Sequence, residues 1–266
     1  MHSPFWNPEP QPSIGMACNI YNDVNAVAGL LQTASEFFDE LVFYHAGPQG
    51  AYSTDGTIEL IEKWGAKIVF GSIDEGFGIV RSSAIKSCST EWVMVLDADE
   101  RFWPNAPVVL PHGTEAGKIH VQFFEDCYSQ GSLLRRMIRN PHFDAISTIR
   151  RHWADFSWKR PVQNWHVTPD YQMRIVRNLP HIGFKAEVRM HEHMWNFETK
   201  SPPRSIGAEP YRGLFHDHYH CFFKPMERDQ RAHDIAIFDA IHECRVPPKA
   251  LTQEERDRID LRIHHT

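Results

Sequence analysis

The N-terminal third of the chain repeats one pattern three times: a short apolar segment, then a segment whose apolar residues recur at helical spacing. The expected strands are 14–21, 40–44 and 67–70, and the expected helices begin near Asp23, Thr54 and Gly76. Such short strand–helix units predict parallel strands, because each helix carries the chain back across the sheet. We therefore expect an α/β fold with a mainly parallel sheet, which binds ligands at the carboxyl ends of its strands.

A fourth apolar run, Trp92–Leu96, ends abruptly in the acids Asp97, Asp99 and Glu100. If the strand continues into the acids, side-chain alternation puts Asp97 and Asp99 on one side and Ala98 on the other. Neighbouring carboxylates suit Mg²⁺ or Mn²⁺, and such a cation can bridge to phosphate groups. Two nearby acids also occur often in loops that cap a helix. Other motifs in the sequence are therefore needed to choose between a metal site and a helix cap.

The order of the motifs resembles glycosyltransferase family 2, whose members have the GT-A nucleotide-sugar fold. The motifs are an Asn-containing first loop (19–23), Thr-Asp-Gly-Thr (54–57), Gly-Phe-Gly-x-x-Arg-x-x-Ala-Ile (76–85) and Trp-Val-x-x-Leu-Asp-Ala-Asp-Glu (92–100). Each motif is weak alone, but the ordered set is specific. The resemblance is good from Ile14 to about Phe102 and continues more thinly to Lys224.

The resemblance implies a GT-A sheet flanked by helices, with an acceptor-side extension and C-terminal helices. We expect a tail over 1–13, one glycosyltransferase domain over 14–224 and a helical segment over 225–266. Within the domain, 14–103 forms the nucleotide-sugar half and 104–224 the acceptor half. The implied activity is metal-dependent, inverting transfer of a sugar, of the hexosyltransferase type, from a nucleotide diphosphate sugar to an acceptor hydroxyl.

Site residues follow from the same resemblance, motif by motif. The catalytic base is Glu192, in the segment Met-His-Glu-His (190–193). The cation, Mn²⁺ or Mg²⁺, is expected on Asp97, Asp99 and His216, with His218 as the alternative to His216. The residues expected to bind the nucleotide sugar are Ala17, Asn19, Asp55, Arg81, Asp97, Ala98 and Gly183.

Two regions depart from the family pattern. The acid that often follows the second strand and holds the nucleotide base is absent, and Tyr44–Gly50 stands in its place. UDP is the nucleotide that the family uses most often, but this loop leaves the base open. Between 124 and 169 the regular pattern fails, and we expect acceptor binding by Trp153, Trp158 and Trp165, because aromatic rings stack on sugar faces. The same rings could instead fill a second small core.

Three other kinds of protein remain possible. The 17 histidines include clusters at 191–193 and 216–220, whose alternating spacing is also found in zinc hydrolases. A nucleotidyltransferase would use a similar core and two acids, although such enzymes usually have a basic N-terminal loop and residues 16–23 contain no basic residue. A carbohydrate-binding protein without activity would need neither a metal nor a base.

Composition limits the partners and the cellular compartment that fit this chain. The formal net charge of −6 argues against a general nucleic-acid binder. No run approaches the roughly twenty apolar residues of a membrane span, and the Pro-rich start lacks the apolar core of a signal peptide. The five cysteines have no metal or disulfide spacing, which fits a reducing compartment. We therefore expect a cytoplasmic protein whose partners are a nucleotide-sugar donor, with a UDP-sugar favoured, and an unidentified acceptor.

Overall fold

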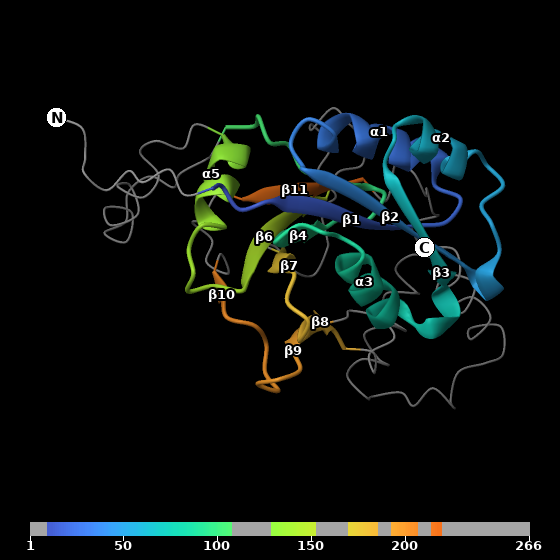
Figure 1. Ribbon diagram of the computed structural model, residues 1–266. Coiled ribbons are helices and arrows are strands. Elements are labelled where there is room, and N and C mark those ends of the chain that lie inside the picture. Colours follow the sequence, from blue (N-terminus) through green and yellow to red (C-terminus); the bar gives the residue numbers. More distant parts are fainter. Residues whose placement is uncertain (1–9, 108–128, 153–169, 186–192, 207–213, 220–266) are drawn as a thin grey trace, which may run out of the picture.

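The computed structural model describes residues 10–107, 129–152, 170–185, 193–206 and 214–219 (Figure 1). All three expected strand–helix units form, and the fourth apolar run is a strand. These elements are β1 (Ile14–Ile20), α1 (Val24–Ala34), β2 (Glu40–Gly47), α2 (Thr57–Lys63), β3 (Lys67–Ser72), α3 (Phe77–Lys86) and β4 (Trp92–Val95). Two short 3-10 helices, η1 (Pro48–Gly50) and η2 (Ile73–Glu75), follow β2 and β3.

The later elements complete the same sheet. They are β5 (Glu100–Arg101), α5 (Gln130–Met137), β6 (Ala145–His152), β7 (Asp170–Arg177), β8 (Ile182–Phe184), β9 (Met194–Asn196), β10 (Ser205–Ile206) and β11 (Phe215–His218). The strand order is β3-β2-β1-β4-β7-β6-β11-β5, with β10 beside β6, and β8 and β9 form a separate pair. β7 and β5 run antiparallel to their neighbours, and the other pairs in the large sheet are parallel. The expected α/β fold with a mainly parallel sheet is therefore confirmed.

The alternation of β1 divides the core into two layers. Ile14, Met16 and Cys18 pack on one face of the sheet, in the cluster that contains α1, α2 and α5. Ala17 points to the other face, where α3 and the β8–β9 pair complete a second cluster. Figure 1 shows α1 and α2 above the sheet and α3 with β8 and β9 below it. Because both faces are covered, the central strands contain few polar residues.

The second strand is longer than the sequence indicates. It was expected to end at Tyr44, but it continues to Gly47 because His45, Ala46 and Gly47 pair with the end of β3. Gly71 makes this pairing possible, since a Cβ atom there would lie 2.1 Å from the Tyr44 hydroxyl oxygen. The extension brings the loop after β2 to the carboxyl edge of the sheet.

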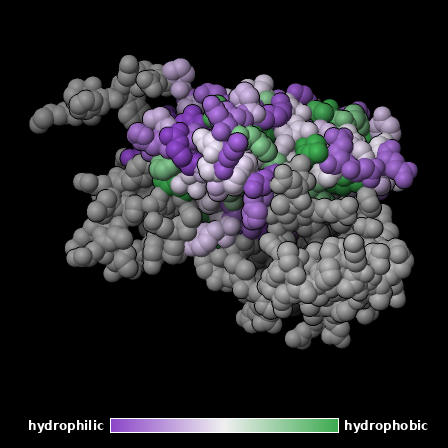
Figure 2. All heavy atoms as spheres, turned by 90° about the horizontal axis from the view of Figure 1, so that it is seen from below, coloured by the Kyte–Doolittle hydropathy of each residue, from purple (hydrophilic) through white to green (hydrophobic). Residues whose placement is uncertain are grey.

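The described surface is mainly polar, with apolar side chains in small groups, in the view of Figure 2. No helix among the described residues is long and apolar enough to cross a membrane. Residues 1–9 of the expected tail (1–13), the tryptophans Trp153, Trp158 and Trp165, and the C-terminal segment 225–266 lie outside the described residues.

The start of the sheet is tied to α5 by one ion pair. Asp39 accepts the backbone N–H of Ile14 at 2.7 Å and binds the guanidinium of Arg135 through both oxygens, at 2.9 and 3.0 Å. Arg135 also donates to the carbonyl of Phe37 at 2.8 Å. Although partial burial acts to raise the pKa of Asp39, the hydrogen bonds from Arg135 and Ile14 lower it.

We predict that Asp39→Asn destabilises the chain at pH 7 by about 1 kcal/mol or less, because the pair is largely exposed. The pKa of Asp39 is lowered in the folded state, so its contribution is present above the ordinary aspartate value of about 3.9 and is lost as the pH falls below it. Urea unfolding of both proteins at pH 7 and pH 3 measures the difference. Glu36→Gln, a change at an exposed acid nearby, is the control. A difference that is the same at both pH values would contradict the assignment.

Candidate active site

The acids after β4 lie in a tight turn. β4 ends at Val95, and the N–H of Glu100 donates to the carbonyl of Asp97 at 2.9 Å. The expectation that Asp97 and Asp99 extend from one side of a continuing strand is therefore wrong. The chain leaves strand geometry before the acids, and the turn directs the two carboxylates to different partners. We call residues 97–100 the acidic turn.

Asp97 faces two arginines. Its Oδ1 lies 2.6 Å from Nη2 of Arg81 on α3, and its Oδ2 lies 3.2 Å from Nη2 of Arg174 on β7. Arg81 was expected to bind the nucleotide sugar, and in the structure its guanidinium contacts a carboxylate of the chain itself. Two guanidinium groups therefore balance the charge of Asp97, at the carboxyl end of β4.

Glu100 and Arg174 form a buried pair that the sequence reasoning missed. Their Oε1 and Nη2 atoms are 2.5 Å apart, and both side chains are almost fully buried. Burial acts to raise the pKa of Glu100, but Arg174, together with His216 and His218, outweighs this effect and holds the pKa well below the usual range. The signal in the sequence was an arginine flanked by the apolar residues Met173 and Ile175 within a strand, because a charge in such a position needs a buried partner.

The two candidate metal histidines have different neighbours. His216 is fully buried, with Nδ1 2.8 Å from the Thr148 hydroxyl and Nε2 3.3 Å from Oε1 of Glu100. Burial lowers the pKa of His216 despite the opposing charge of Glu100, so the ring is neutral near pH 7. Nε2 of His218 instead lies 3.6 Å from Oδ2 of Asp99. The structure thus brings His218, the alternative, beside Asp99.

A divalent cation fits this corner of the site. Among the described residues no three His, Cys, Asp or Glu side chains converge as a complete metal cage. Asp99 and His218 nevertheless present one carboxylate oxygen and one imidazole nitrogen to each other, a donor pair that Mn²⁺ accepts. Cations at phosphate sites usually take only one or two carboxylates from the protein, with phosphate oxygens and water as further ligands. The residues present therefore suit a cation shared with a phosphate group.

The residues expected to bind the nucleotide sugar divide into two groups. Asn19 lies near the carboxyl end of β1, and its buried side-chain oxygen has no hydrogen-bond partner among the described residues. This oxygen could accept a hydrogen bond from a ligand. Arg81 and Asp97 lie at the acidic turn, as described. By contrast, the side chains of Ala17 and Ala98 are buried in the core, so only their main chain could approach a ligand.

Asp55 and Gly183 make contacts within the chain that explain why these residue types occur at these positions. Asp55 accepts hydrogen bonds from the N–H of Val24 and from the N–H and hydroxyl of Thr57, so it joins the first turns of α1 and α2. A Cβ atom at Gly183 would lie 2.9 Å from the Ser82 hydroxyl, so this glycine lets β8 pack closely on α3. Both residues hold the site together, and these contacts do not require a ligand.

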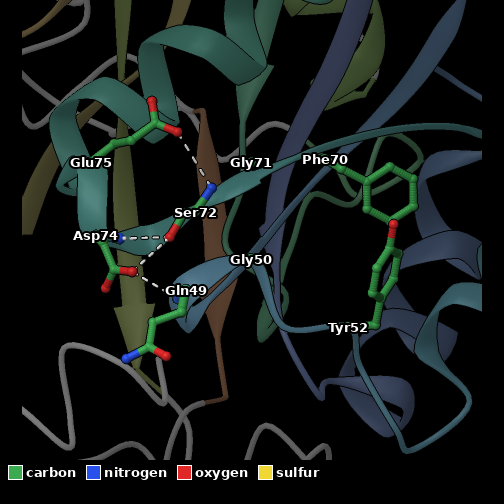
Figure 3. Close-up of a pocket in the computed structure, with 8 residues that line it drawn as sticks. All are labelled: Gln49, Gly50, Tyr52, Phe70, Gly71, Ser72, Asp74 and Glu75. Atoms are coloured by element: carbon green, nitrogen blue, oxygen red, sulfur yellow. Dashed lines mark hydrogen bonds between the residues drawn. The ribbon is translucent and has the colours of Figure 1, made fainter.

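A shallow hollow of about 560 Å³ lies at the carboxyl ends of β2 and β3 (Figure 3). It is lined by Gln49, Gly50, Tyr52, Phe70, Gly71, Ser72, Asp74 and Glu75. The rings of Tyr52 and Phe70 lie 5.3 Å apart and are 63% and 49% exposed. Large exposed aromatics in a hollow are typical of binding surfaces. The sequence reasoning missed this feature because it depends on the extension of β2.

The ring of His45 packs against both aromatic rings of the hollow. Its ring centroid lies 5.4 Å from that of Phe70 and 6.0 Å from that of Tyr52. Its Nε2 accepts the N–H of Ser53 at 3.0 Å and lies 2.9 Å from the Ser53 hydroxyl. Burial lowers the pKa of His45, so the ring is neutral at pH 7. The segment Tyr44–Gly50, which stands in the place of the family's acid, therefore contains an uncharged histidine with an internal partner.

The expected catalytic base, Glu192, lies outside the described residues. The segment that contains it begins and ends at the β8–β9 pair, where the N–H of Lys185 donates to the carbonyl of His193 at 3.1 Å. β8 packs against α3, the helix that carries Arg81: the N–H of Phe184 donates to the Ser82 hydroxyl at 2.7 Å. Both ends of this segment, Lys185 and His193, are therefore held on the face of the sheet that α3 covers.

Comparison with known proteins identifies the family. The description "Glycosyl transferase family 2" matches residues 51–186, which is just over half of the chain. The chain therefore belongs to glycosyltransferase family 2, as the motif order indicated. A comparison with curated proteins finds no significant match.

Several solved glycosyltransferase structures are similar at low identity. Glucosyl-3-phosphoglycerate synthase from Mycobacterium tuberculosis, in complex with Mn²⁺, UDP and its product, is 17% identical with a TM-score of 0.34, over 57% of this chain and 50% of that one. A mannosyltransferase from Pyrobaculum calidifontis, in complex with GDP-mannose and Mn²⁺, is 13% identical with a TM-score of 0.46, over 86% and 61%. TarS from S. aureus is 14% identical with a TM-score of 0.43, over 91% and 46%. The chain thus spans about half the length of the structures that it matches.

Proposed function

We propose that this protein is an inverting glycosyltransferase that transfers a sugar from a nucleotide diphosphate sugar to an acceptor hydroxyl, with the help of Mn²⁺ or Mg²⁺. The observation that carries the proposal is the acidic turn. It sets Asp99 beside His218, and Asp97 between Arg81 and Arg174, at the carboxyl end of a central strand. Family membership favours this activity over a nucleotidyltransferase, a zinc hydrolase or a binding protein. We further propose that 14–224 acts as one domain.

The leaving diphosphate requires positive charge. A divalent cation held by Asp99 and His218 would neutralise it as a Lewis acid. Arg81 adds a guanidinium group, whose planar fork matches phosphate oxygens, and Arg174 adds a buried positive charge. Both arginines contact Asp97, so they are held at the point where the diphosphate would lie. Their fixed position lets them stabilise the departing charge without reorganisation.

The geometry of the sheet supports a donor that runs from the acidic turn, past β1, to the hollow at the ends of β2 and β3. Adjacent strands lie about 4.8 Å apart, so the ends of β2 and β3 are about 10–14 Å from the end of β4, roughly the length of an extended nucleoside diphosphate. A donor with its diphosphate at the acidic turn would pass Asn19 on β1 and place its base at the hollow. Stacking on Tyr52 or Phe70 would hold the base. Because His45 is neutral and bonded to Ser53, no acid at this position selects uracil.

The acceptor hydroxyl must lose its proton as it attacks. Glu192 is the base proposed for this step, in the segment anchored by β8 and β9. A carboxylate that acts across from the diphosphate gives a single displacement with inversion at the anomeric carbon. Trp153, Trp158 and Trp165 remain the residues proposed to bind the acceptor.

Our first functional prediction concerns the cation. Mn²⁺ together with the right nucleoside diphosphate raises the apparent stability by about 2.7 kcal/mol at 100 times the dissociation constant. A thermal-shift screen of UDP, GDP, ADP and CDP with and without Mn²⁺ measures this effect. Asp99→Ala and His218→Ala should remove the part of the shift that depends on Mn²⁺. His216→Ala should instead lower the melting temperature of the protein without ligand, because this ring is buried beside Glu100. A normal Mn²⁺ response in the Asp99 variant would sink the metal assignment.

The hollow gives a second prediction. Tyr52→Ala should weaken binding of the best diphosphate from the screen by about 1–3 kcal/mol, or roughly 5- to 150-fold in Kd, if the base stacks on this ring. Trp64→Ala is the matched control, because Trp64 is an exposed aromatic that does not line the hollow. Calorimetry measures both affinities. Equal affinities for the Tyr52 variant and the wild type would place the base elsewhere.

A third prediction concerns catalysis. Glu192→Gln keeps the size and hydrogen bonding of the side chain but removes its basicity. Turnover should fall by a factor of about 10² to 10⁴, while donor binding stays unchanged. Release of nucleoside diphosphate and calorimetric donor binding are to be measured on one preparation. Turnover within a few-fold of the wild type would show that Glu192 is not the base.

A further inference from the structure

Arg101 follows the acidic turn directly, and its charged side chain is 1% exposed. One guanidinium nitrogen, Nη1, donates to the carbonyls of Ala98 and Glu100, both at 2.7 Å. The other, Nη2, donates to the carbonyl of Ala26 on α1 at 2.6 Å. Arginine is rarely buried unless it is fully paired. Here its hydrogen-bond partners include main-chain carbonyls on the two sides of Asp99 and on the neighbouring helix, and its charge also interacts with that of Asp99.

The carbonyl of Asp99 itself is also held, because it accepts the N–H of Tyr219 at 2.9 Å. Three consecutive carbonyls of the turn, at residues 98, 99 and 100, therefore have fixed donors. Tyr219 directly follows His218, so the same bond joins the turn to the end of β11. This leaves the backbone around Asp99 little freedom to rotate.

Gly29 provides the space for the guanidinium. A Cβ atom at this position of α1 would lie 2.6 Å from Nη2 and 3.1 Å from Nε of Arg101. Glycine within a helix costs about 1 kcal/mol relative to alanine, so its presence in the middle of α1 calls for a reason. Gly29 and Ala26 are three residues apart on one side of the helix, and together they form the seat of Arg101.

We propose that Arg101, seated against Gly29, is a positioning residue that orients Asp99 toward His218 for cation binding. This inference rests on the proposed function. The fixed carbonyls determine the direction of the Asp99 side chain, and α1 supplies a rigid support for them. Ligands held in place before the cation arrives bind it more tightly, because less order must be created on binding.

The test measures binding of Mn²⁺ alone to the full chain by electron paramagnetic resonance of free and bound Mn²⁺. Arg101→Met should weaken Mn²⁺ binding about 10- to 100-fold, as outer partners of metal ligands usually do. Gly29→Ala should also weaken it, because the new methyl group displaces the guanidinium. Once Arg101 is absent, Gly29→Ala should have no further effect, so the double variant should bind like Arg101→Met.

Arg177→Met is the matched control, since Arg177 also donates to main-chain carbonyls, those of Phe143 and Asn140, but at the start of β4, where it pairs with Trp92, and not at the acidic turn. Circular dichroism melting checks that each variant is folded. If Arg101→Met does not fold, Gly29→Ala alone decides. Wild-type Mn²⁺ affinity in a folded Gly29→Ala, or an equal loss in the Arg177 control, contradicts the inference. A wild-type chain that binds no Mn²⁺, either alone or with the best nucleoside diphosphate of the thermal-shift screen, contradicts the proposed function and this inference with it.

Discussion

The buried ion pair between Glu100 and Arg174 is the interaction on which the site depends. Taking each charge out of water costs several kcal/mol, and removing one partner leaves the other uncompensated. The pair therefore requires β7, which carries Arg174, to lie beside β4 and the acidic turn. That requirement agrees with the insertion of β7 between β4 and β6, antiparallel to both. One electrostatic contact thus links the N-terminal strand–helix units to the later strands in a single sheet.

The same contact explains why the acids have different tasks. Glu100 is satisfied by Arg174 and faces the neutral ring of His216, so it belongs to the interior. Asp97 contacts Arg174 as well as Arg81, so one carboxylate holds two guanidinium groups. Asp99 points away from this cluster, toward His218. Three acids within four residues therefore have three different kinds of partner: a buried arginine, a pair of arginines and a histidine.

The strand–helix units could be predicted because their signals are local. Helical spacing in Val24–Ala34 and the apolar run at Trp92 require knowledge only of neighbouring residues. The turn geometry, the pairing of Arg174 and the extension of β2 to Gly47 could not, because each depends on a strand that is distant in the sequence. The resemblance pointed to the segments that contain Asp55 and Gly183, but it could not reveal that Asp55 bonds to Val24 and Thr57 or that Gly183 lets β8 pack on α3. Those contacts appear only when α2 and β8 are in place.

The choice between His216 and His218 shows where sequence patterns reach their limit. The two residues are two positions apart on β11, so alternation puts both on the same face and the sequence alone cannot separate them. The register of β11 against β5 decides. His218 pairs with Glu100 and Asp217 with Arg101, so His218 lies next to the turn and His216 lies further inside. His216, at the inner position, is buried beside Glu100, whose charge is already balanced by Arg174. This environment favours a neutral imidazole ring that is hydrogen-bonded to Thr148. The outer position places His218 beside Asp99, the acid proposed to hold the cation, so a shift of the register by two residues would exchange the surroundings of the two histidines.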